Sequence, residues 1–179
     1  NPGDTREQVL SRREFLEGGF YTPIRDSLCR LASGEQGPIL DVGCGEGYYS
    51  THLAETLGAE LTGLDISKEA VRCAAAKYKD AKWLCATAAH IPVPAESADL
   101  LTSLFALTLP EEFHRVLKPG GYYFQVLAAE DHLLGLKSII YPTLTHKEKN
   151  TSPELPGFTL IRQIPVRFTF TVEGEQVQN

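Results

Sequence analysis

The sequence predicts an α/β fold: one domain with a mostly parallel central sheet whose two faces are covered by helices. Short apolar runs alternate with stretches of helical periodicity along most of the 179 residues, an order typical of parallel sheets. The run 99–105 is almost continuously apolar, as a strand buried on both faces should be. The stretch 38–47 passes from an apolar run through an acid into three glycines at every second position. A strand, a tight turn and a helix start are therefore expected there, the form that a nucleotide-like ligand needs.

Two helices are expected before the first strand. Asp4 is the predicted N-cap of the first, with Glu7 three residues later, and the glycines at 18–19 end it. Thr22 is the predicted N-cap of the second helix, because Pro23 fits the first helical position. Apolar residues at every third or fourth position of this second helix predict one buried face.

Strands and helices then alternate to the end of the chain. Strands are expected over 39–42, 61–66, 83–86, 99–105 and 122–128. Helices are expected over 48–57, 67–78, 110–117 and 131–141. A turn is expected at 118–121 and a polar, mobile loop over 143–156. The runs 158–164 and 166–172 alternate or stay apolar, so they are expected to form a closing antiparallel strand pair.

Composition and charge restrict the kind of protein. With 42% hydrophobic and 22% charged residues, the chain can bury the core of one domain. No apolar run approaches the roughly 18 residues of a membrane span, and no signal peptide is visible, so a cytoplasmic protein is expected. A net charge of −6 provides no basic footprint for nucleic acid. The four cysteines are scattered without a CxxC pair, so they are interpreted as reduced thiols and no metal site is predicted.

Glycine-rich and polar segments follow several predicted strands and should meet at one edge of the sheet. Ligands of parallel α/β sheets bind outside the carboxyl ends of the strands, where 43–47, Asp65 and the segments after the third and fifth strands fall. Asp65 lies 24 residues after Asp41, and an acid there can accept both hydrogen bonds of a ribose diol. Because Ser67 follows closely, Asp65 could instead be a turn acid or a helix cap. The glycine loop upstream favours the ribose role.

The spacing of the glycines and the acids around them indicate the type of ligand. A dinucleotide loop reads G-x-G-x-x-G and holds a pyrophosphate, whereas this loop reads Gly43-x-Gly45-x-Gly47. Asp41 and Glu46 would repel a pyrophosphate, and they suit a ligand that has no phosphate and carries positive charge. S-adenosyl-L-methionine fits because it has both a sulfonium and an ammonium. An NAD-dependent oxidoreductase is disfavoured for the same reason.

Segments spread over nearly the whole chain carry a family resemblance. They are residues 12–16, 19–23, 41–49, 63–68, 90–92, 118–121 and 136–141. The glycine loop, Asp65 and the turn at 118–121 are similar to those of the Rossmann-like class I S-adenosylmethionine-dependent methyltransferases. The segment 19–23 and the predicted helix around 132–141 resemble more specifically the large-subunit (23S) ribosomal RNA (guanine-N1)-methyltransferases.

The resemblance implies roles for the matching residues. Gly43, Gly45 and Glu46 would hold the methionine part of the cofactor S-adenosyl-L-methionine, and Asp65 would hold its ribose. Tyr21 would fold over the cofactor pocket, although it could also be an ordinary core aromatic residue.

The remaining cofactor-binding predictions concern the rim of the pocket. His132 would lie near the cofactor or the substrate guanine, although its ring could also be solvated at a helix N-terminus. Thr87 stands where related methyltransferases often have an acid that contacts the adenine amine, so backbone groups near Ala88 are expected to take that role. Asp41 and Ile66 complete the predicted set.

The resemblance also sets expectations for domains and partners. Residues 1–37 are expected to form helices that cap the cofactor pocket, and 38–179 to form the cofactor-binding core. Family members carry an N-terminal cysteine-rich zinc module and extend beyond Asn179, and the chain starts at Asn1 without any methionine, so it is interpreted as a fragment. The implied substrate is a ribosomal RNA hairpin, with RNA binding by this fragment left open. No membrane partner is expected, and a homodimer is left open.

The expected reaction is methyl transfer to N1 of a guanine in 23S ribosomal RNA. This nitrogen carries a proton near neutral pH, so a base would help, and the candidates are Glu46, Asp131 and His132, none of them an obvious choice. Two alternatives stay open. One is a methyltransferase of a small metabolite, which the acidic net charge favours, and the other is a non-catalytic module that binds S-adenosylmethionine.

Overall fold

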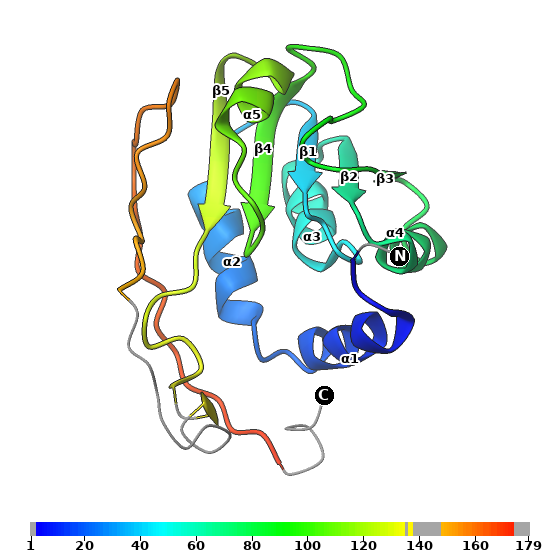
Figure 1. Ribbon diagram of the computed structural model, residues 1–179, viewed down its shortest axis with the longest axis vertical. Coiled ribbons are helices and arrows are strands. Elements are labelled where there is room, and N and C mark those ends of the chain that lie inside the picture. Colours follow the sequence, from blue (N-terminus) through cyan, green and yellow to red (C-terminus); the bar gives the residue numbers. More distant parts are fainter. Residues whose placement is uncertain (1–2, 135, 138–147, 174–179) are drawn as a thin grey trace.

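The computed structural model describes residues 3–134, 136–137 and 148–173, and its centre is a parallel sheet of five strands (Figure 1). The strands are β1 (Ile39–Val42), β2 (Leu61–Asp65), β3 (Lys82–Cys85), β4 (Ala98–Leu104) and β5 (Leu117–Val126). Their order across the sheet is β3-β2-β1-β4-β5, and every neighbouring pair is parallel. The chain therefore turns back at the centre of the sheet, between β1 and β4, which confirms the predicted α/β class. Ligands of such sheets bind at this point of reversal.

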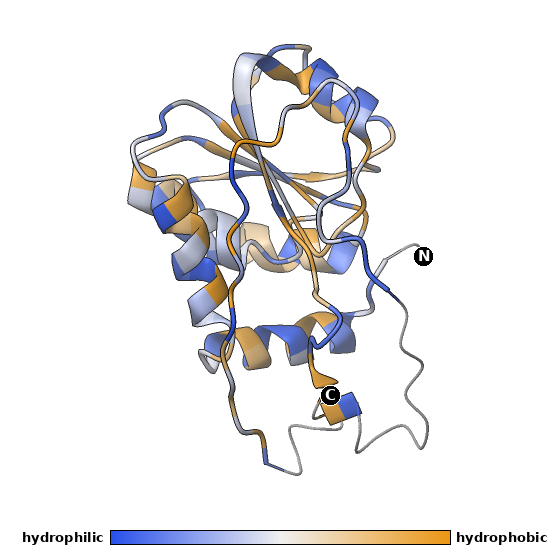
Figure 2. Cartoon of the chain, turned by 90° about the vertical axis from the view of Figure 1, so that its left-hand side faces the viewer, coloured by the Kyte–Doolittle hydropathy of each residue, from blue (hydrophilic) through white to orange (hydrophobic). Residues whose placement is uncertain are grey.

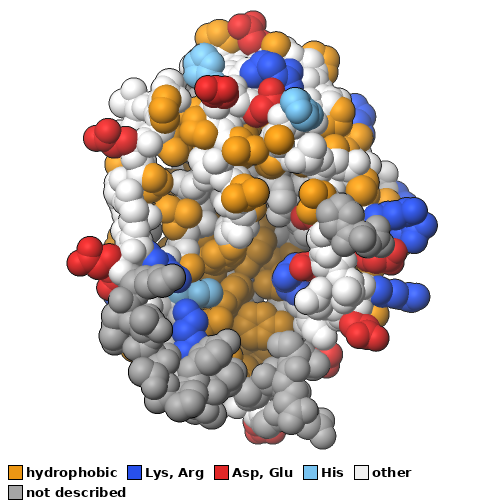
Figure 3. All heavy atoms as spheres, viewed as in Figure 1, with side chains coloured by type: hydrophobic (Ala, Val, Ile, Leu, Met, Phe, Trp, Pro, Cys, Tyr) orange, Lys and Arg blue, Asp and Glu red, His pale blue; other side chains and the backbone are white. Residues whose placement is uncertain are grey.

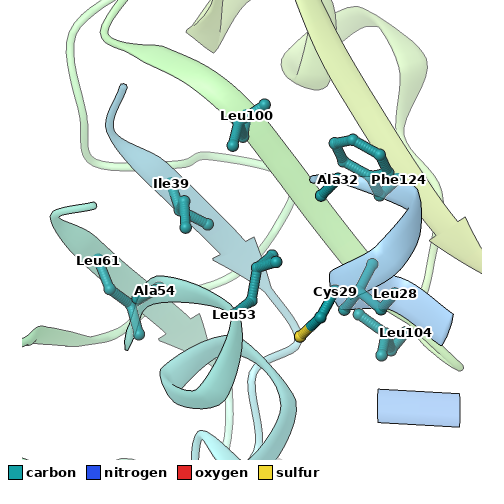
Figure 4. Packing of buried hydrophobic residues seen from close by; sticks show 10 residues of the cluster. All are labelled: Leu28, Cys29, Ala32, Ile39, Leu53, Ala54, Leu61, Leu100, Leu104 and Phe124. Atoms are coloured by element: carbon teal, nitrogen blue, oxygen red, sulfur yellow. The ribbon is translucent and has the colours of Figure 1, made fainter. Parts of the chain in front are cut away.

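Helices cover both faces of the sheet, as predicted. They are α1 (Arg6–Glu17), α2 (Thr22–Leu31), α3 (Tyr48–Leu57), α4 (Lys68–Lys77) and α5 (Pro110–Val116). Ile39 of β1 packs in one buried cluster with side chains of α2 and α3 (Figure 4). Its neighbour Leu40 faces the other side and packs with Phe113 of α5. Figure 2 shows hydrophobic positions concentrated where the strands pass between the helices. Among the described helices, none is long and apolar enough to cross a membrane.

The starts of the first two helices differ from the prediction by one residue. Thr5, not Asp4, is the N-cap of α1, because its hydroxyl accepts the Gln8 amide while the Gln8 side chain accepts the Thr5 amide. Tyr21 is the N-cap of α2 without a side-chain cap bond, so Thr22 is already helical.

The carboxyl-terminal third departs further from the prediction. Residues 118–121 belong to β5 instead of forming a separate turn, and the register slips there, since Ala98 pairs with Leu117 but Leu100 pairs with Tyr122. This irregularity absorbs the extra residues that the Pro-Gly-Gly sequence introduces. Helical structure after residue 131 is confined, within the described part, to 134 and 136–137. Residues 138–141 of the predicted helix and 143–147 of the predicted loop lie outside the described residues.

The predicted closing antiparallel pair is wrong. No strand is assigned over 158–172, although all of these residues are described. Phe168 and Phe170 pack against Tyr21, whereas Leu160 and Ile161 are 69% and 77% exposed. An alternating pattern requires only an extended backbone with one packed side; a strand pair also requires a hydrogen-bonding partner, which the sequence pattern does not specify.

Candidate functional site

The glycine loop between β1 and α3 is shaped by backbone conformations that favour glycine. Gly43, Gly45 and Gly47 have φ angles of 78°, 55° and 84°. A Cβ on Gly43 would lie 2.6 Å from the Ala106 side chain, and one on Gly47 would lie 2.3 Å from the Trp83 ring. Gly45 has no neighbour within 4 Å of its Cβ position. The loop is therefore pressed against the protein at its ends and is open at its middle.

Asp65 lies directly beside this open position. One carboxylate oxygen accepts the Gly45 amide at 2.8 Å, and the other accepts the Ser67 amide at 2.8 Å. Both roles considered from the sequence are therefore compatible, because Asp65 fixes the turn before α4 and also lies against the glycine loop. A carboxylate has about four acceptor positions, so two remain for a ligand.

Buried carboxylates give the loop a negative environment. Asp41 is 3% exposed and accepts the Thr102 hydroxyl at 2.8 Å, and burial raises its pKa to about 6, against the effect of that bond. Burial and the neighbouring Asp41 and Asp65 also raise the pKa of the Cys44 thiol well above its usual value. At neutral pH an ionised Asp41 thus lies near a neutral Cys44 thiol, with Asp65 close by. This charge distribution disfavours a pyrophosphate and suits a cationic ligand.

Glu46 has a partner that was not predicted, Arg13 of α1. The Arg13 Nε donates to Glu46 Oε2, and the Glu46 side chain is 3% exposed. The hydrogen bond with Glu46 is the main cause that raises the Arg13 pKa. The other oxygen, Oε1, and Arg13 Nη2 are both buried, and neither hydrogen-bonds to any described residue. One carboxylate oxygen and one guanidinium nitrogen thus lack a hydrogen-bond partner. A ligand that carries both an ammonium and a carboxylate could supply both partners.

Tyr21 and His132 meet although 111 residues separate them. The Tyr21 Oη and His132 Nε2 atoms are 2.8 Å apart. Burial raises the Tyr21 pKa, whereas burial and then the charges of Lys137 and Lys149 lower the His132 pKa. A neutral phenol and a neutral imidazole therefore share this hydrogen bond at neutral pH. Phe168 and Phe170 contact the edge of the Tyr21 ring, with ring centroids 6.1 Å away.

The last three predicted residues lie after β2 and β3. Ile66 is 45% exposed, so it offers an apolar surface next to Asp65. The Ala86 amide donates to the Asp65 carbonyl at 3.0 Å, which places the following turn beside β2. In that turn the Thr87 hydroxyl accepts the Ala89 amide, and Ala88 packs on the buried cluster that contains Leu40 and Phe113. The structure therefore brings the predicted residues to one edge of the sheet.

A large hollow borders this edge on the side of β5 (Figure 3). Tyr21, Phe105 and His132 line it, but the residues 43–47 and Asp65 do not. The edge thus has two parts, the glycine loop with Asp65 and Glu46, and an aromatic part at the hollow. The contact of Ala106 with Gly43 joins them.

Two residues of the site, Arg13 and Phe105, were not predicted as site residues from the sequence. Arg13 lies in the segment 12–16 that carries the family resemblance, yet one arginine on a helix has no local pattern that identifies its partner. Phe105 was predicted only as the end of a strand, although an aromatic residue at the carboxyl end of a central strand is a usable signal for a site residue.

Comparison with known proteins is consistent with this geometry. Residues 40–125 match the family described as a methyltransferase domain. YxjB of Bacillus subtilis, provisionally named a 23S rRNA (guanine-N(1)-)-methyltransferase, is 29% identical in an alignment that covers 95% of this chain and 66% of YxjB. The 23S rRNA (guanine(748)-N(1))-methyltransferase of Streptomyces fradiae is 31% identical in an alignment that covers 96% of this chain and 65% of that protein. The chain thus spans about two thirds of the length of these relatives.

Other similar proteins have different names. The demethylmenaquinone methyltransferase of Chlorobaculum tepidum is 32% identical over 134 residues, which cover 69% of this chain and 53% of that enzyme. A crystal structure from Methanococcus maripaludis, provisionally described as an S-adenosyl-L-methionine-dependent methyltransferase, shares the fold with a TM-score of 0.60 at 20% identity, covering 78% of this chain and 73% of that one. Residues 40–125 thus match the methyltransferase-domain family, and the sheet has the Rossmann-like class I fold, for which S-adenosyl-L-methionine is the expected cofactor.

Proposed function

We propose that the protein transfers a methyl group from S-adenosyl-L-methionine to N1 of a guanine in 23S ribosomal RNA. The observation that carries the cofactor half of this proposal is the open glycine position beside Asp65, next to the incomplete Arg13–Glu46 ion pair. The substrate half is supported by the names of the two relatives that align with 95% and 96% of the chain.

Each part of the site has a role in this proposal. Asp65 accepts the two ribose hydroxyls with its remaining lone pairs, and Glu46 Oε1 accepts the ammonium of the methionine part. Arg13 Nη2 donates to the carboxylate of the same part, so both buried atoms gain a partner on binding. When bound, S-adenosyl-L-methionine supplies a methyl group already activated on its sulfonium.

The adenine and the pocket cover complete the cofactor site. Ile66 contacts one face of the adenine ring, and the backbone near Thr87 and Ala88 contacts its edge. Arg13 and Tyr21 both come from residues 1–37, so this part of the chain covers the pocket that 38–179 builds. Covering the site excludes water and orients the acceptor, and such orientation can contribute about 7–11 kcal/mol to a reaction.

The candidate bases all have partners in the structure. Glu46 pairs with Arg13, Asp131 pairs with Arg167, and His132 hydrogen-bonds with Tyr21. We therefore assign binding and orienting roles and leave the acceptor of the N1 proton unassigned.

The test is methyl transfer to 23S ribosomal RNA that lacks N1-methylguanine, followed by mass spectrometry of the nucleosides. We expect N1-methylguanine with the unchanged protein and about 10–100-fold weaker cofactor binding for Asp65→Ala, since two hydrogen bonds to a charged group are lost. Asp80→Ala, at an exposed turn before β3, is the matched control. Cofactor binding without N1-methylguanine would contradict the ribosomal RNA substrate and leave the cofactor assignment intact.

A small-molecule acceptor is the second candidate. The net charge of −6 and the similarity to a demethylmenaquinone methyltransferase favour it. An isoprenoid quinol precursor offered under the same conditions distinguishes the two, because methylation of the precursor with ribosomal RNA left unmodified would select the small-molecule reaction.

A further inference from the structure

Three rings gather at the carboxyl ends of β4 and β5, and we call Tyr21, Phe105 and His132 the ring cluster. Phe105 and His132 are stacked, with centroids 5.7 Å apart and planes 19° apart. Tyr21 lies 6.2 Å from Phe105 and hydrogen-bonds to His132. Phe105 is 41% exposed, so part of its ring remains uncovered. The cluster is thus an ordered aromatic surface that faces the hollow.

The backbone holds Phe105 in this position in spite of strain. Phe105 has a φ of 54°, a conformation rarely adopted by non-glycine residues. Its amide donates to the Val126 carbonyl at 3.0 Å, which ties the strained residue to β5. Leu133, next to His132, has a φ of 56°, and among the described residues only Glu96 is a third non-glycine case. Such conformations cluster at functional sites, and here one belongs to Phe105 of the stacked pair and the other to the residue that follows His132.

The cluster lies on the acceptor side of the edge. Ala106, the residue after Phe105, touches the position where a Gly43 Cβ would stand. The ring cluster therefore begins where the glycine loop ends. Because the glycine loop and Asp65 do not line the hollow, a molecule in the hollow can reach the cluster without occupying the cofactor positions.

Cations lie near the same opening in spite of the acidic net charge. Arg167 lines the hollow and pairs with Asp131, and the charges of Lys137 and Lys149 reach His132 and lower its pKa. Figure 3 shows Lys or Arg side chains beside a histidine at the rim of the hollow, whose floor is hydrophobic. Aromatic surfaces bordered by cations are the features that bind unpaired nucleotides, with bases stacked on rings and phosphates near the charges.

We propose that Phe105, stacked on His132, binds the acceptor base after that base has left its RNA stack, with Lys137, Lys149 and Arg167 near the flanking phosphates. The proposal rests on the proposed function and specifies its substrate as an unpaired nucleobase in a loop or an extruded position. An enzyme that modifies a base edge must take the base out of the stack, and an aromatic surface next to the methyl donor would hold it there.

The test compares Phe105→Leu, which removes the aromatic face, with Phe105→Tyr, which keeps it. Leu107→Ala is the control, because Leu107 is 75% exposed in the same segment and does not line the hollow. We expect Phe105→Leu to raise KM for RNA about tenfold, in line with the loss of one stacked base, while the Kd for S-adenosylhomocysteine stays unchanged. Phe105→Tyr and Leu107→Ala should keep the KM of the unchanged protein.

A binding titration separates this proposal from the proposed function, because it requires no turnover. The probe is a short unpaired RNA with one guanine, compared with the same RNA carrying an abasic site at that position. The unchanged protein should prefer the guanine RNA about tenfold, and Phe105→Leu should lose this preference. The stacking role would be overturned if Phe105→Leu preferred the guanine RNA over the abasic RNA as strongly as the unchanged protein does. Loss of S-adenosylhomocysteine binding by Phe105→Leu would also overturn it. Absence of N1-methylguanine with this preference intact would overturn only the proposed reaction.

Discussion

At the scale of single residues, Asp41 combines burial with an ionisable group. Its side chain is buried and accepts the hydroxyl of Thr102 in β4. Burial raises its pKa to about 6, whereas the same carboxyl in an unfolded chain titrates near 3.8. Between these values the folded protein binds a proton that the unfolded chain has released, so the carboxyl stabilises the fold at low pH and this contribution disappears as the pH rises through 6.

Asp41→Asn should remove this pH dependence. Between pH 5 and pH 7.5 we expect the stability of the unchanged protein relative to the variant to fall by about 1 kcal/mol, since the amide can still accept the Thr102 hydroxyl but does not ionise. Urea unfolding of both proteins at the two pH values measures the difference. The titration of His132 occurs in both proteins and cancels. A difference that is constant or grows with pH would contradict the buried, proton-binding carboxyl.

At the scale of elements, the ring of Trp83 in β3 explains why glycine stands at both position 47 and position 63. The Cβ of a residue at position 47 would lie 2.3 Å from the Trp83 ring, and at position 63 in β2 it would lie 2.4 Å away. The ring cannot retreat easily, because its Nε1 donates to the Tyr78 carbonyl at 3.0 Å. The indole thus occupies the space beside Gly47 and Gly63 that a Cβ would need.

Gly63→Ala should therefore be destabilising although its φ does not favour glycine. The added methyl group would clash with an anchored ring and overpack the core. We therefore expect the variant to lose about 1–3 kcal/mol in the free energy of unfolding. The control is the double variant with Trp83→Leu, in which the smaller side chain leaves room for the methyl group. If Gly63→Ala costs as much in the Trp83→Leu background as alone, contact with the indole is not the cause.

At the scale of the whole molecule, the proposed cofactor site joins α1, the glycine loop and β2, so binding should stabilise the fold as a unit. S-adenosylhomocysteine at about 100 times its Kd should contribute about 2.7 kcal/mol, which corresponds to a rise in Tm of about 5–10 °C for a domain of this size. NAD at the same concentration should leave Tm unchanged, because Asp41, Glu46 and Asp65 disfavour its pyrophosphate. Differential scanning fluorimetry decides this, and an equal rise with NAD would refute the assignment.

The sequence by itself determined the α/β class, the parallel sheet, the glycine loop and the position of Asp65 beside it. These features depend on local properties: the period of apolar residues, the φ angles that favour glycine, and the rule that parallel strands end at one edge. The boundaries of most elements followed within one or two residues for the same reason. The prediction of a turn at 118–121 was wrong because the register of β5 is not a local property. The prediction of a closing strand pair was wrong because the sequence does not specify a hydrogen-bonding partner for 158–172.

Only the tertiary structure decided which side chains complete the site. Arg13 meets Glu46 across 33 residues, Thr102 meets Asp41 across 61, and Tyr21 meets His132 across 111. No periodicity specifies such pairs, because each forms only after helices and strands have packed and have brought distant segments to the same edge. The stacking of Phe105 on His132 has the same origin, and it depends in addition on a strained φ that the sequence does not reveal.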